Sequence, residues 1–413
     1  MEKRRRNFVY TQAVMLRFLT AGESHGRALT VIVDGLPAGL AVAEDAIAAE
    51  LARRQLGYGR GRRMAIERDR AQILGGVRRG QTTGAPVSLL IENRDWPNWQ
   101  HTMSVEREPA ADAGGARRAP VTRPRPGHAD LAGGLKFDLA DLRDVLERAS
   151  ARETAARVAA GTLARLLLAD LDITITSHVY RVGDAGIDDP SGVTFDDAAA
   201  IAADSPLRCA DPAMERAMMA AIDRAKEAGD TLGGAFEVIA RGVPAGLGSY
   251  TQWDQKLDGR LGQALMSIPA IKGVGIGAGP AVAALPGSAV HDEIVPGDSP
   301  TGLARPTNRA GGVEGGVTNG EPIRVSAFMK PISTLMKPLR SVDLSTGEPS
   351  TAAIERSDVC AIAAAAVVGE AALAWVIATA AREKFGGDTL GDMRGAAAAY
   401  RDRLRRRVPA PKA

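Results

Sequence analysis

Two short stretches of this sequence occur twice and in the same order, and this repetition constrains the fold more than any other feature. Residues 31–40 (VIVDGLPAGL) are echoed by residues 238–247 (VIARGVPAGL). Residues 76–86 and 312–322 share the pattern G-V-x-x-G-x-T-x-G-x-P without a gap. Glycine and proline turns can look alike by chance, but two ordered matches favour a strand-turn-helix-strand unit that occurs twice. The sequence therefore predicts one domain with two similar sheets and with the long helices between or beneath them.

A helix is predicted over residues 150–169, because the apolar side chains there have helical spacing. Ser150 and Glu153 have the spacing of a capping box, so the helix is expected to begin there. Its N terminus, which would attract anions, is flanked by Arg148 and Arg152. The two arginines could instead decorate a solvated helix face, but no helix face explains the cationic loop RPRPGHAD just upstream. The segment predicts an anion site, most simply for phosphate, and the ligand could be a nucleotide, a flavin or a phosphorylated substrate.

Two histidines lie in glycine-containing polar loops, where a side chain can reach a binding site. His25 is in the segment GESHG and His128 is in the segment RPRPGHAD, and either could be a general acid or base near neutral pH. For His101, His178 and His291 we expect structural roles. A second cationic cluster lies in and beside a glycine- and arginine-rich loop and comprises Arg54, Arg60, Arg62 and Arg63.

Composition narrows the class of protein. Hydrophobic residues make up 45% and charged residues 24% of the 413 residues, which is typical of a globular chain. The net charge of +3 suits acidic small molecules as well as nucleic acid and does not decide between them. Cys209 and Cys360 have no metal-ligand spacing, so we expect no metal site and a reducing cytoplasm. Walker, Rossmann and nucleophile-elbow patterns do not occur, which disfavours common nucleotide folds without excluding phosphate binding.

The predicted organisation is a disordered basic leader at residues 1–14, a single domain at residues 15–390 with a flexible loop at about 93–122, and a basic C-terminal tail at residues 391–413. Residues 359–381 form an apolar run long enough to span a bilayer. Glu370 interrupts that run and alanine dominates it. A buried central helix is therefore predicted there, and no membrane association is expected.

Three of these segments together closely resemble the chorismate synthase family: GESHG at 22–26, RPGHAD at 125–130 running into RASARET at 148–154, and RSD at 356–358. The resemblance covers residues 15 to about 385. It implies an α+β fold, in which a helical core is sandwiched between two antiparallel β-sheets, and a homotetramer. It also implies a carbon-oxygen lyase of the shikimate pathway, which serves aromatic amino acid biosynthesis. Such an enzyme makes chorismate by anti-1,4-elimination of phosphate from 5-enolpyruvylshikimate 3-phosphate, using reduced FMN without net redox change.

The resemblance also implies a role for each matching residue. His25 would protonate the departing phosphate, His128 would support the protonation state of the reduced flavin, and Asp358 would assist proton handling near the flavin. The substrate phosphate and carboxylates would be held by Arg54, Arg60, Arg63, Arg125, Arg152 and Arg356. FMN contacts would fall at Arg148, Ala149, Ser150, Pro269, Ala270, Gly315, Lys330, Pro331, Ile332, Ser333, Thr334 and Arg356. NADPH, which would reduce the flavin directly or through a separate reductase, would contact Arg54 and Arg60.

The sequence departs from the family at a few positions and leaves two alternatives open. Pro269 stands where some relatives have asparagine, and Gln55 and Leu56 stand where others have arginine and proline. Another FMN- or phosphate-dependent lyase on a related scaffold is the enzymatic alternative. An RNA-binding protein rich in arginine and glycine is the alternative of another class, but aromatic residues make up only 4% of the chain and offer few stacking platforms. We therefore expect no nucleic-acid partner.

Overall fold

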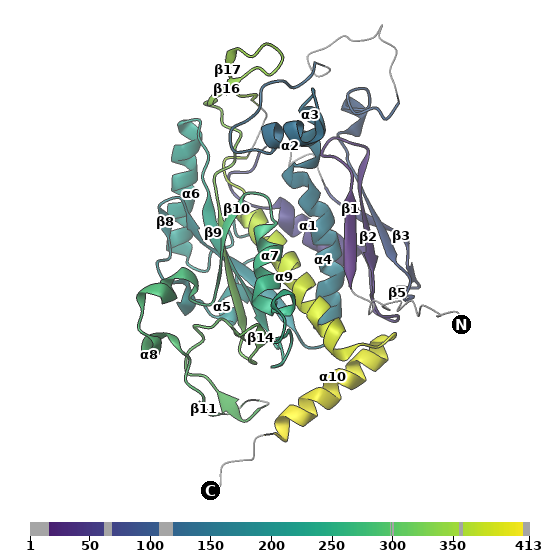
Figure 1. The fold of residues 1–413 in the computed structure, drawn as a ribbon, viewed down its shortest axis with the longest axis vertical. Coiled ribbons are helices and arrows are strands. Elements are labelled where there is room, and N and C mark those ends of the chain that lie inside the picture. The colour runs from purple at the N-terminus through teal and green to yellow at the C-terminus, as the bar shows by residue number, and fades with distance from the viewer. Residues whose placement is uncertain are drawn as a thin grey trace, which may run out of the picture.

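The computed structural model describes residues 16–61, 68–106, 119–297, 299, 301–354 and 358–407. The predicted leader and the predicted site residues Arg63 and Arg356 lie outside these ranges. Within the described residues the chain folds into helices and antiparallel sheets (Figure 1). The predicted mixture of helices and sheets is therefore confirmed.

The first sheet has the strand order β1 (Arg17–Ala21), β2 (Ala28–Asp34), β6 (Val87–Glu92), β3 (Ala71–Gly75), and every neighbouring pair is antiparallel. Alternation of side chains explains why these segments are strands. In β2, for example, the side chains at positions 29, 31 and 33 are buried, whereas Ile32 between them is exposed. One face of this sheet therefore packs on the core and the other faces outward.

The second sheet has the strand order β10 (Ile271–Ile276), β15 (Ile323–Met329), β9 (Gly234–Arg241), β7 (Thr174–Val182), β8 (Ala185–Gly186), again antiparallel throughout. Residues 235–240 of β9 are all buried, including Glu237, so this strand is covered on both faces. The sheet therefore forms a second wall of the core.

Two long helices, α4 (Thr154–Ala169) and α9 (Ile362–Phe385), run between the two sheets (Figure 1). A Cβ on Gly161 would lie 2.4 Å from the Cβ of Ala371, so the two helices approach closely. The helices α1 (Glu44–Gln55) and α7 (Leu257–Met266) pack beside them. Helix α9 is long and apolar enough to cross a membrane, but 83% of its most apolar stretch is buried inside the protein. It is therefore a core helix, as predicted.

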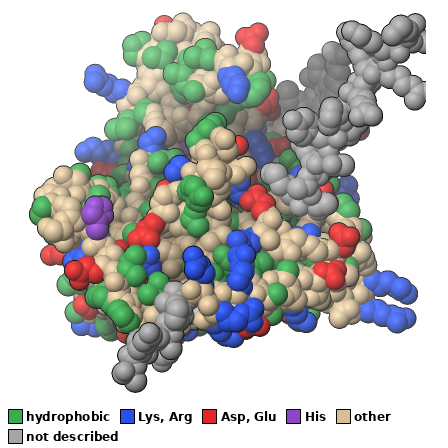
Figure 2. All heavy atoms as spheres, turned by 60° about the horizontal axis from the view of Figure 1, so that its bottom comes forward, with side chains coloured by type: hydrophobic (Ala, Val, Ile, Leu, Met, Phe, Trp, Pro, Cys, Tyr) green, Lys and Arg blue, Asp and Glu red, His purple; other side chains and the backbone are tan. Residues whose placement is uncertain are grey.

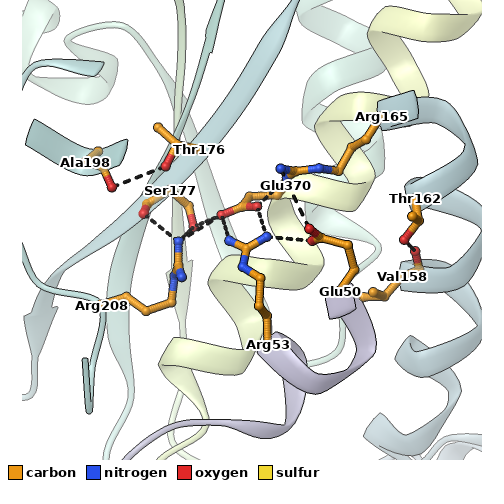
Figure 3. A network of polar contacts seen from close by, with 10 residues as sticks. All are labelled: Glu50, Arg53, Val158, Thr162, Arg165, Thr176, Ser177, Ala198, Arg208 and Glu370. Carbon is orange, nitrogen blue, oxygen red and sulfur yellow. Dashed lines mark hydrogen bonds and ion pairs between the residues drawn. The ribbon is translucent and has the colours of Figure 1, made fainter. Parts of the chain in front are cut away.

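A buried ionic network, which we call the Glu370 cluster, lies inside this core and comprises Glu370, Arg53, Arg165, Arg208 and Ser177 (Figure 3). The fully buried carboxylate of Glu370 accepts hydrogen bonds from Arg53 at 2.8 and 2.9 Å, from Arg208 at 3.1 Å and from the hydroxyl of Ser177 at 2.6 Å. It also accepts one from Arg165. Burial alone would raise the pKa of Glu370, but the three arginines outweigh burial and lower the pKa to about 2. The ionised carboxylate thus joins α1, α4, α9 and β7.

The second repeated pattern forms a short hairpin in each copy: β4 (Val77–Arg78) with β5 (Gln81–Thr82), and β13 (Val313–Glu314) with β14 (Val317–Thr318). Each hairpin makes matching hydrogen bonds to the first repeated stretch of its own copy. The hydroxyl of Thr82 donates to the carbonyl of Pro37 at 2.6 Å, and that of Thr318 donates to the carbonyl of Pro244 at 2.7 Å. Each hydroxyl also accepts a backbone N–H, from residue 40 at 2.9 Å or residue 247 at 2.8 Å. The same threonine therefore closes the same turn in both stretches.

The remaining elements lie outside the two main sheets and the four helices named above. They are η2 (Trp96–Asn98), α2 (Asp130–Phe137), α3 (Arg143–Arg148), η4 (Ala151–Glu153), η5 (Pro190–Gly192), α5 (Phe195–Ala199), α6 (Pro212–Glu227), η6 (Trp253–Gln255), η7 (Gly279–Ala284), α8 (Gly287–Val290), β11 (Val295–Pro296), β12 (Leu303–Ala304), β16 (Arg340–Val342), β17 (Pro349–Thr351) and α10 (Leu390–Arg405).

Helix α10 corrects the prediction of a basic tail from residue 391, which is wrong for residues 391–405. Thr389 and Asp392 form a capping box at its start, and a stripe of buried side chains docks it on the protein. The stripe consists of Leu390, Met393 and Ala397. Figure 2 shows Lys and Arg side chains interspersed with acidic and apolar ones on this side of the molecule. The basic residues therefore decorate a folded helix.

The start of the predicted helix at residue 150 also differs from the expectation. The hydroxyl of Ser150 accepts the backbone N–H of Arg152 and caps the short turn η4, and α4 begins only at Thr154. The carboxylate of Glu153 instead contacts Thr20 at 3.2 Å and Arg157 at 2.9 Å. The predicted capping box is therefore wrong, because Glu153 finds partners on a neighbouring strand and one turn ahead.

Candidate active site

His25 lies in the loop between β1 and β2 and is held by Glu147 at the end of α3. Its ring Nδ1 lies 2.9 Å from both carboxylate oxygens of Glu147, and its backbone N–H donates to Oε2 at 2.8 Å. The loop needs a glycine at Gly22, where φ is +100° and a Cβ would lie 2.2 Å from the carbonyl oxygen of Ala28. The tight loop places the imidazole on the Glu147 carboxylate, whose side chain is fully buried.

Trp99 covers the imidazole of His25. The two rings stack with their centroids 3.9 Å apart and an interplanar angle of 21°. The indole N–H of Trp99 donates to Asp95 at 2.8 Å, and the guanidinium of Arg143 lies 5.6 Å from an indole ring. Position 99 falls within the stretch at about 93–122 that the sequence predicts to be a flexible loop. In the described part of that stretch, Trp99 packs on His25.

Arg54 and Arg152 meet at Asp69, close to the same loop. Arg152 donates to both carboxylate oxygens of Asp69, at 2.6 and 2.7 Å, and to the side-chain oxygen of Asn93 at 2.9 Å. The amide of Asn93 in turn donates to the backbone carbonyl of Gly26 at 2.6 Å. The two arginines are 4% and 5% exposed. Predicted site residues from three separate segments are therefore brought together here.

Arg54 has an incomplete set of partners. Its Nε donates to the hydroxyl of Thr154 and its Nη2 to the carbonyl of Ala151, each at 2.9 Å. Its Nη1 is buried, makes no hydrogen bond and lies 3.7 Å from Asp69. Burial, with help from neighbouring Arg60 and Arg152, lowers the pKa of Arg54 to about 9. A buried cation with a spare donor suits an anionic ligand.

Asp358 lies near the C-terminal end of α1, the end that carries Arg54. A backbone hydrogen bond of 2.8 Å joins residue 359 to residue 59, which follows that helix. Its carboxylate pairs with the Nε of Arg60 at 3.1 Å and accepts the backbone N–H of Gly61 at 2.6 Å. The predicted residues Arg60 and Asp358 are thus adjacent. Their predicted neighbours Arg63 and Arg356 lie outside the described residues.

A second group of predicted residues is built around Asp130 at the start of α2. This fully buried carboxylate accepts the Nε of Arg125 at 2.8 Å and lies 2.5 Å from Nδ1 of His128. Burial alone would raise the pKa of Asp130, but hydrogen bonds from His128 and Arg125 outweigh it and hold the pKa well below its ordinary value. Arg125 also donates to the hydroxyl of Thr334 at 3.1 Å. His128 is thus fixed at Nδ1 by a carboxylate, as His25 is.

The segment at residues 330–334 lies against this second group. The ammonium of Lys330 donates to the carbonyl of Gly127 at 2.9 Å, and its backbone N–H donates to the carbonyl of Ala270 at 2.9 Å. Burial and the nearby Lys272 lower the pKa of Lys330. Ala270, which follows Pro269, has a φ of +68°. Residues predicted to contact FMN from two segments therefore converge beside His128.

The other predicted FMN contacts divide into two places. Arg148 donates to the carbonyls of Thr20 and Gly22 at 3.0 and 2.9 Å, and Ser150 shares a hydrogen bond with Ser24, so the segment 148–150 lies against the loop of His25. Gly315 lies in the β13–β14 turn near the start of β15, whereas Lys330 follows its end. The strand between them spans about 20 Å. The structure does not bring Gly315 together with the other predicted contacts.

Sequence reasoning missed Glu147, Trp99, Asp69 and Asp130, which hold the predicted residues in place. Glu147 and Asp130 could have been found, because each lies within or next to a segment already singled out. Glu147 is 122 positions from its partner His25, and no pattern of local spacing links them. Asp69 and Trp99 carried no sequence signal.

The site combines buried arginines, neighbouring lysines and two histidines held by carboxylates, on a fold of mixed helices and sheets. This combination is typical of an enzyme that acts on an anionic small molecule. A family profile described as chorismate synthase matches residues 16–381. The chain belongs to the chorismate synthase family, a family of lyases in the shikimate pathway. The family and the enzyme class predicted from the sequence are therefore confirmed.

Individual relatives agree with this assignment. The chain is 61% identical over 390 residues to a chorismate synthase of Moorella thermoacetica, which covers 94% of this chain and 99% of that protein. It is 56% identical over 380 residues to one from Desulforamulus reducens, covering 92% and 97%. A crystal structure of a chorismate synthase superposes with a TM-score of 0.76 at 40% identity, covering 95% of this chain and 99% of that one.

Proposed function

We propose that the chain catalyses the anti-1,4-elimination of phosphate from 5-enolpyruvylshikimate 3-phosphate to give chorismate, with reduced FMN bound and without net redox change. The observation that carries the proposal is the site itself. Two histidines held at Nδ1 by buried carboxylates lie in the family's segments. Buried arginines lie near them, and one of these, Arg54, retains a donor for an anion. No such pair of held histidines is needed by a protein that only binds RNA.

The arginines bind the phosphate and carboxylates of the substrate in this proposal. Planar guanidinium groups suit bidentate contacts with such groups. The unsatisfied Nη1 of Arg54 supports this role, as does the burial of Arg125 and Arg152. Arg60 completes the set within the described residues. Arg356 is assigned to the set by its place in the RSD segment, and Arg63 by the resemblance to the family. Arg54 and Arg60 are also the proposed contacts of NADPH.

His25 donates a proton to the departing phosphate, which is a better leaving group once protonated. His128, oriented by Asp130, supports the protonation state of the reduced flavin. Asp358 assists proton handling near the flavin, beside the cationic Arg60. Each of these three side chains is anchored by a charged partner.

The residues present fit a flavin phosphate. Lys330 and Lys272 are close enough for each positive charge to disfavour the other, and an anion placed beside them would relieve that repulsion. Reduced FMN supplies electron density that eases loss of the allylic phosphate. We assign its binding to residues 148–150, 269–270 and 330–334 and to Arg356, with NADPH as the reductant, used directly or through a separate reductase. Gly315 is also a proposed flavin contact, and a homotetramer is the proposed assembly.

We further propose that residues 15–390 form one domain with an internal pseudo-repeat, in which a helical core is sandwiched between the two antiparallel sheets. The matching hydrogen bonds of Thr82 and Thr318 support the repeat. Two free, buried cysteines support a reducing, cytoplasmic setting. No nucleic acid or membrane takes part in the proposed function.

The test is anaerobic turnover of 5-enolpyruvylshikimate 3-phosphate with chemically reduced FMN, following chorismate and phosphate together. Equal amounts of both products are expected, with turnover slowed by about 10²-fold or more in His25→Ala and His128→Ala. Folded, flavin-bound protein that releases neither product would contradict the substrate assignment and favour another FMN- or phosphate-dependent lyase. Normal turnover in either variant would return that histidine to a structural role.

A further inference from the structure

Two donors of one residue converge on the carboxylate of Glu147. The backbone N–H of His25 points at Oε2, and the ring Nδ1 of His25 lies between Oε1 and Oε2. The side chain of Glu147 is fully buried, whereas 15% of the His25 side chain is exposed. Glu147 therefore lies on the interior side of the imidazole ring, and the imidazole lies between Glu147 and the solvent-exposed side.

The chemistry of this contact fixes the position of the ring proton. An ionised carboxylate only accepts hydrogen bonds, so the nitrogen that faces it must carry a hydrogen. In the neutral ring that nitrogen is Nδ1, and Nε2 then has the free lone pair. In the doubly protonated ring, the proton that can leave without breaking the contact with Glu147 is the one on Nε2.

The plane of the ring is fixed as well. Trp99 stacks on one face of the imidazole, and the indole is itself held by its hydrogen bond to Asp95. The charged groups near this contact are Glu147 and Arg143, whose guanidinium lies 4.0 Å from Glu147 and beside the indole. The imidazole thus has one hydrogen-bonded edge, one covered face and a fixed direction for Nε2.

We propose that Glu147 is a positioning residue that keeps His25 protonated at Nδ1, so that Nε2 alone exchanges the catalytic proton. The inference rests on the proposed function, in which His25 protonates the departing phosphate. When the proton moves, the Nε2–H bond breaks and an O–H bond forms on the phosphate. The imidazolium becomes neutral imidazole, already in the tautomer that Glu147 requires, and the Glu147 carboxylate stays ionised throughout.

Glu147→Gln tests this idea because it should weaken the preference for Nδ1–H without changing the shape of the side chain. The backbone N–H of His25 still needs the amide oxygen as its acceptor, so the amide NH2 takes the place of the other oxygen and faces Nδ1 as a donor. Nδ1 lies 2.9 Å from both positions, so it meets one donor and one acceptor where it met two acceptors. The neutral ring should therefore carry its hydrogen on Nε2 in part of the molecules. Glu153→Gln is the matched control, because Glu153 is also mostly buried and nearby but bonds to Thr20 and Arg157.

The tautomer is measured by solid-state ¹⁵N NMR on full-length protein labelled with ¹⁵N only at histidine. The chain has five histidines, and the His25→Ala spectrum identifies the His25 signals by their loss. We expect Nδ1–H in the unmodified protein and in Glu153→Gln, and a measurable population of Nε2–H in Glu147→Gln. Neutral His25 with its hydrogen on Nε2 in the unmodified protein would overturn the proposal, even if Glu147→Gln failed to fold.

Turnover of the same samples provides the second measurement. Glu147→Gln should lower kcat about 10²-fold with little change in KM, because the proton donor and not substrate binding is altered. A population of Nε2–H in Glu147→Gln with unchanged kcat would overturn the positioning role. The two proposals fail separately: unmodified protein that never produces chorismate would contradict the proposed function, whereas the NMR result stands without any substrate.

Discussion

Arg53 and Arg54 are consecutive residues of α1, yet their side chains enter two different charged clusters. Arg53 belongs to the Glu370 cluster, where it donates to Glu370 at 2.8 and 2.9 Å and to Glu50 at 2.5 Å. Arg54 points toward the start of α4 and donates to Thr154 at 2.9 Å. Neighbouring helix positions are separated by about 100°, so the two guanidinium groups leave α1 on different faces.

The two clusters differ in how completely the cations are matched. Burial alone would lower the pKa of Arg53, but Glu370 and Glu50 outweigh it and raise the pKa above its ordinary value. Burial lowers the pKa of Arg54 to about 9, since its nearest carboxylate, on Asp69, is 3.7 Å away and not hydrogen bonded to it. A matched buried cluster fixes the fold, whereas a cluster with a spare cationic donor is suited to receive an anion.

The largest effect is expected from Glu370→Ala. The substitution would leave three partly buried arginines around a methyl group, and loss of one partner from a buried ionic network costs about 3–5 kcal/mol. The free energy of unfolding, measured with urea, should fall by that amount, while turnover by the protein that remains folded stays unchanged. Glu383→Ala, at a partly exposed ion pair on the same helix, is the control and should change stability by less than about 1 kcal/mol. Equal losses in both variants would contradict a special role for the Glu370 cluster.

The same cluster should give the protein a pH-dependent stability. The pKa of Glu370 is about 2 in the folded protein, compared with 4.5 for an ordinary glutamate. A lowered carboxylate pKa contributes stability that is present above pH 4.5 and is lost as the pH falls toward 2, by about 3 kcal/mol in total. Urea unfolding between pH 6 and pH 3 should therefore show a shallower slope in Glu370→Gln than in the unmodified protein. Asp130 also has a lowered pKa but is present in both, so parallel slopes would refute the assignment to Glu370.

Lysine substitutions at the two consecutive arginines separate the clusters directly. Arg54→Lys keeps the charge but removes the planar fork, so kcat/KM should fall about 10²-fold if Arg54 contacts the substrate. Arg53→Lys makes the same chemical change in the Glu370 cluster and should lower the unfolding temperature while leaving kcat/KM within about twofold. Steady-state kinetics and thermal unfolding of both variants provide the measurement. Loss of activity in Arg53→Lys without loss in Arg54→Lys would reverse our assignment of the two clusters.

Sequence alone predicted the features whose signal is local. The apolar run around Glu370 correctly predicted a buried helix, and three short segments correctly predicted the family. The sequence analysis names Arg54 and not Arg53, but the spacing of the residues gives no physical reason for the difference, because that difference arises from partners elsewhere in the chain. Glu370 is 317 positions from Arg53 and Thr154 is 100 positions from Arg54. Only the packing of α1 against α4 and α9 determines which arginine meets which partner.

Two predictions are wrong for different reasons. The arginines of residues 391–413 favour a tail, but Leu390, Met393 and Ala397 have the spacing of a buried helical stripe, which is a local signal for α10. The spacing of Ser150 and Glu153 favours a capping box, but Glu153 contacts Thr20 on a distant strand, which local spacing does not report.

The smallest effect is expected at Glu50, which touches Arg53 from the outer edge of the Glu370 cluster. Its side chain is 18% exposed, compared with full burial for Glu370, and solvent therefore screens its pair with Arg53 at 2.5 Å. Glu50→Gln should cost no more than about 1 kcal/mol in urea unfolding, because Glu370 still satisfies Arg53. A loss as large as that of Glu370→Ala would mean that the arginines need both carboxylates. The stability of the cluster would then depend on both carboxylates together, and not mainly on Glu370.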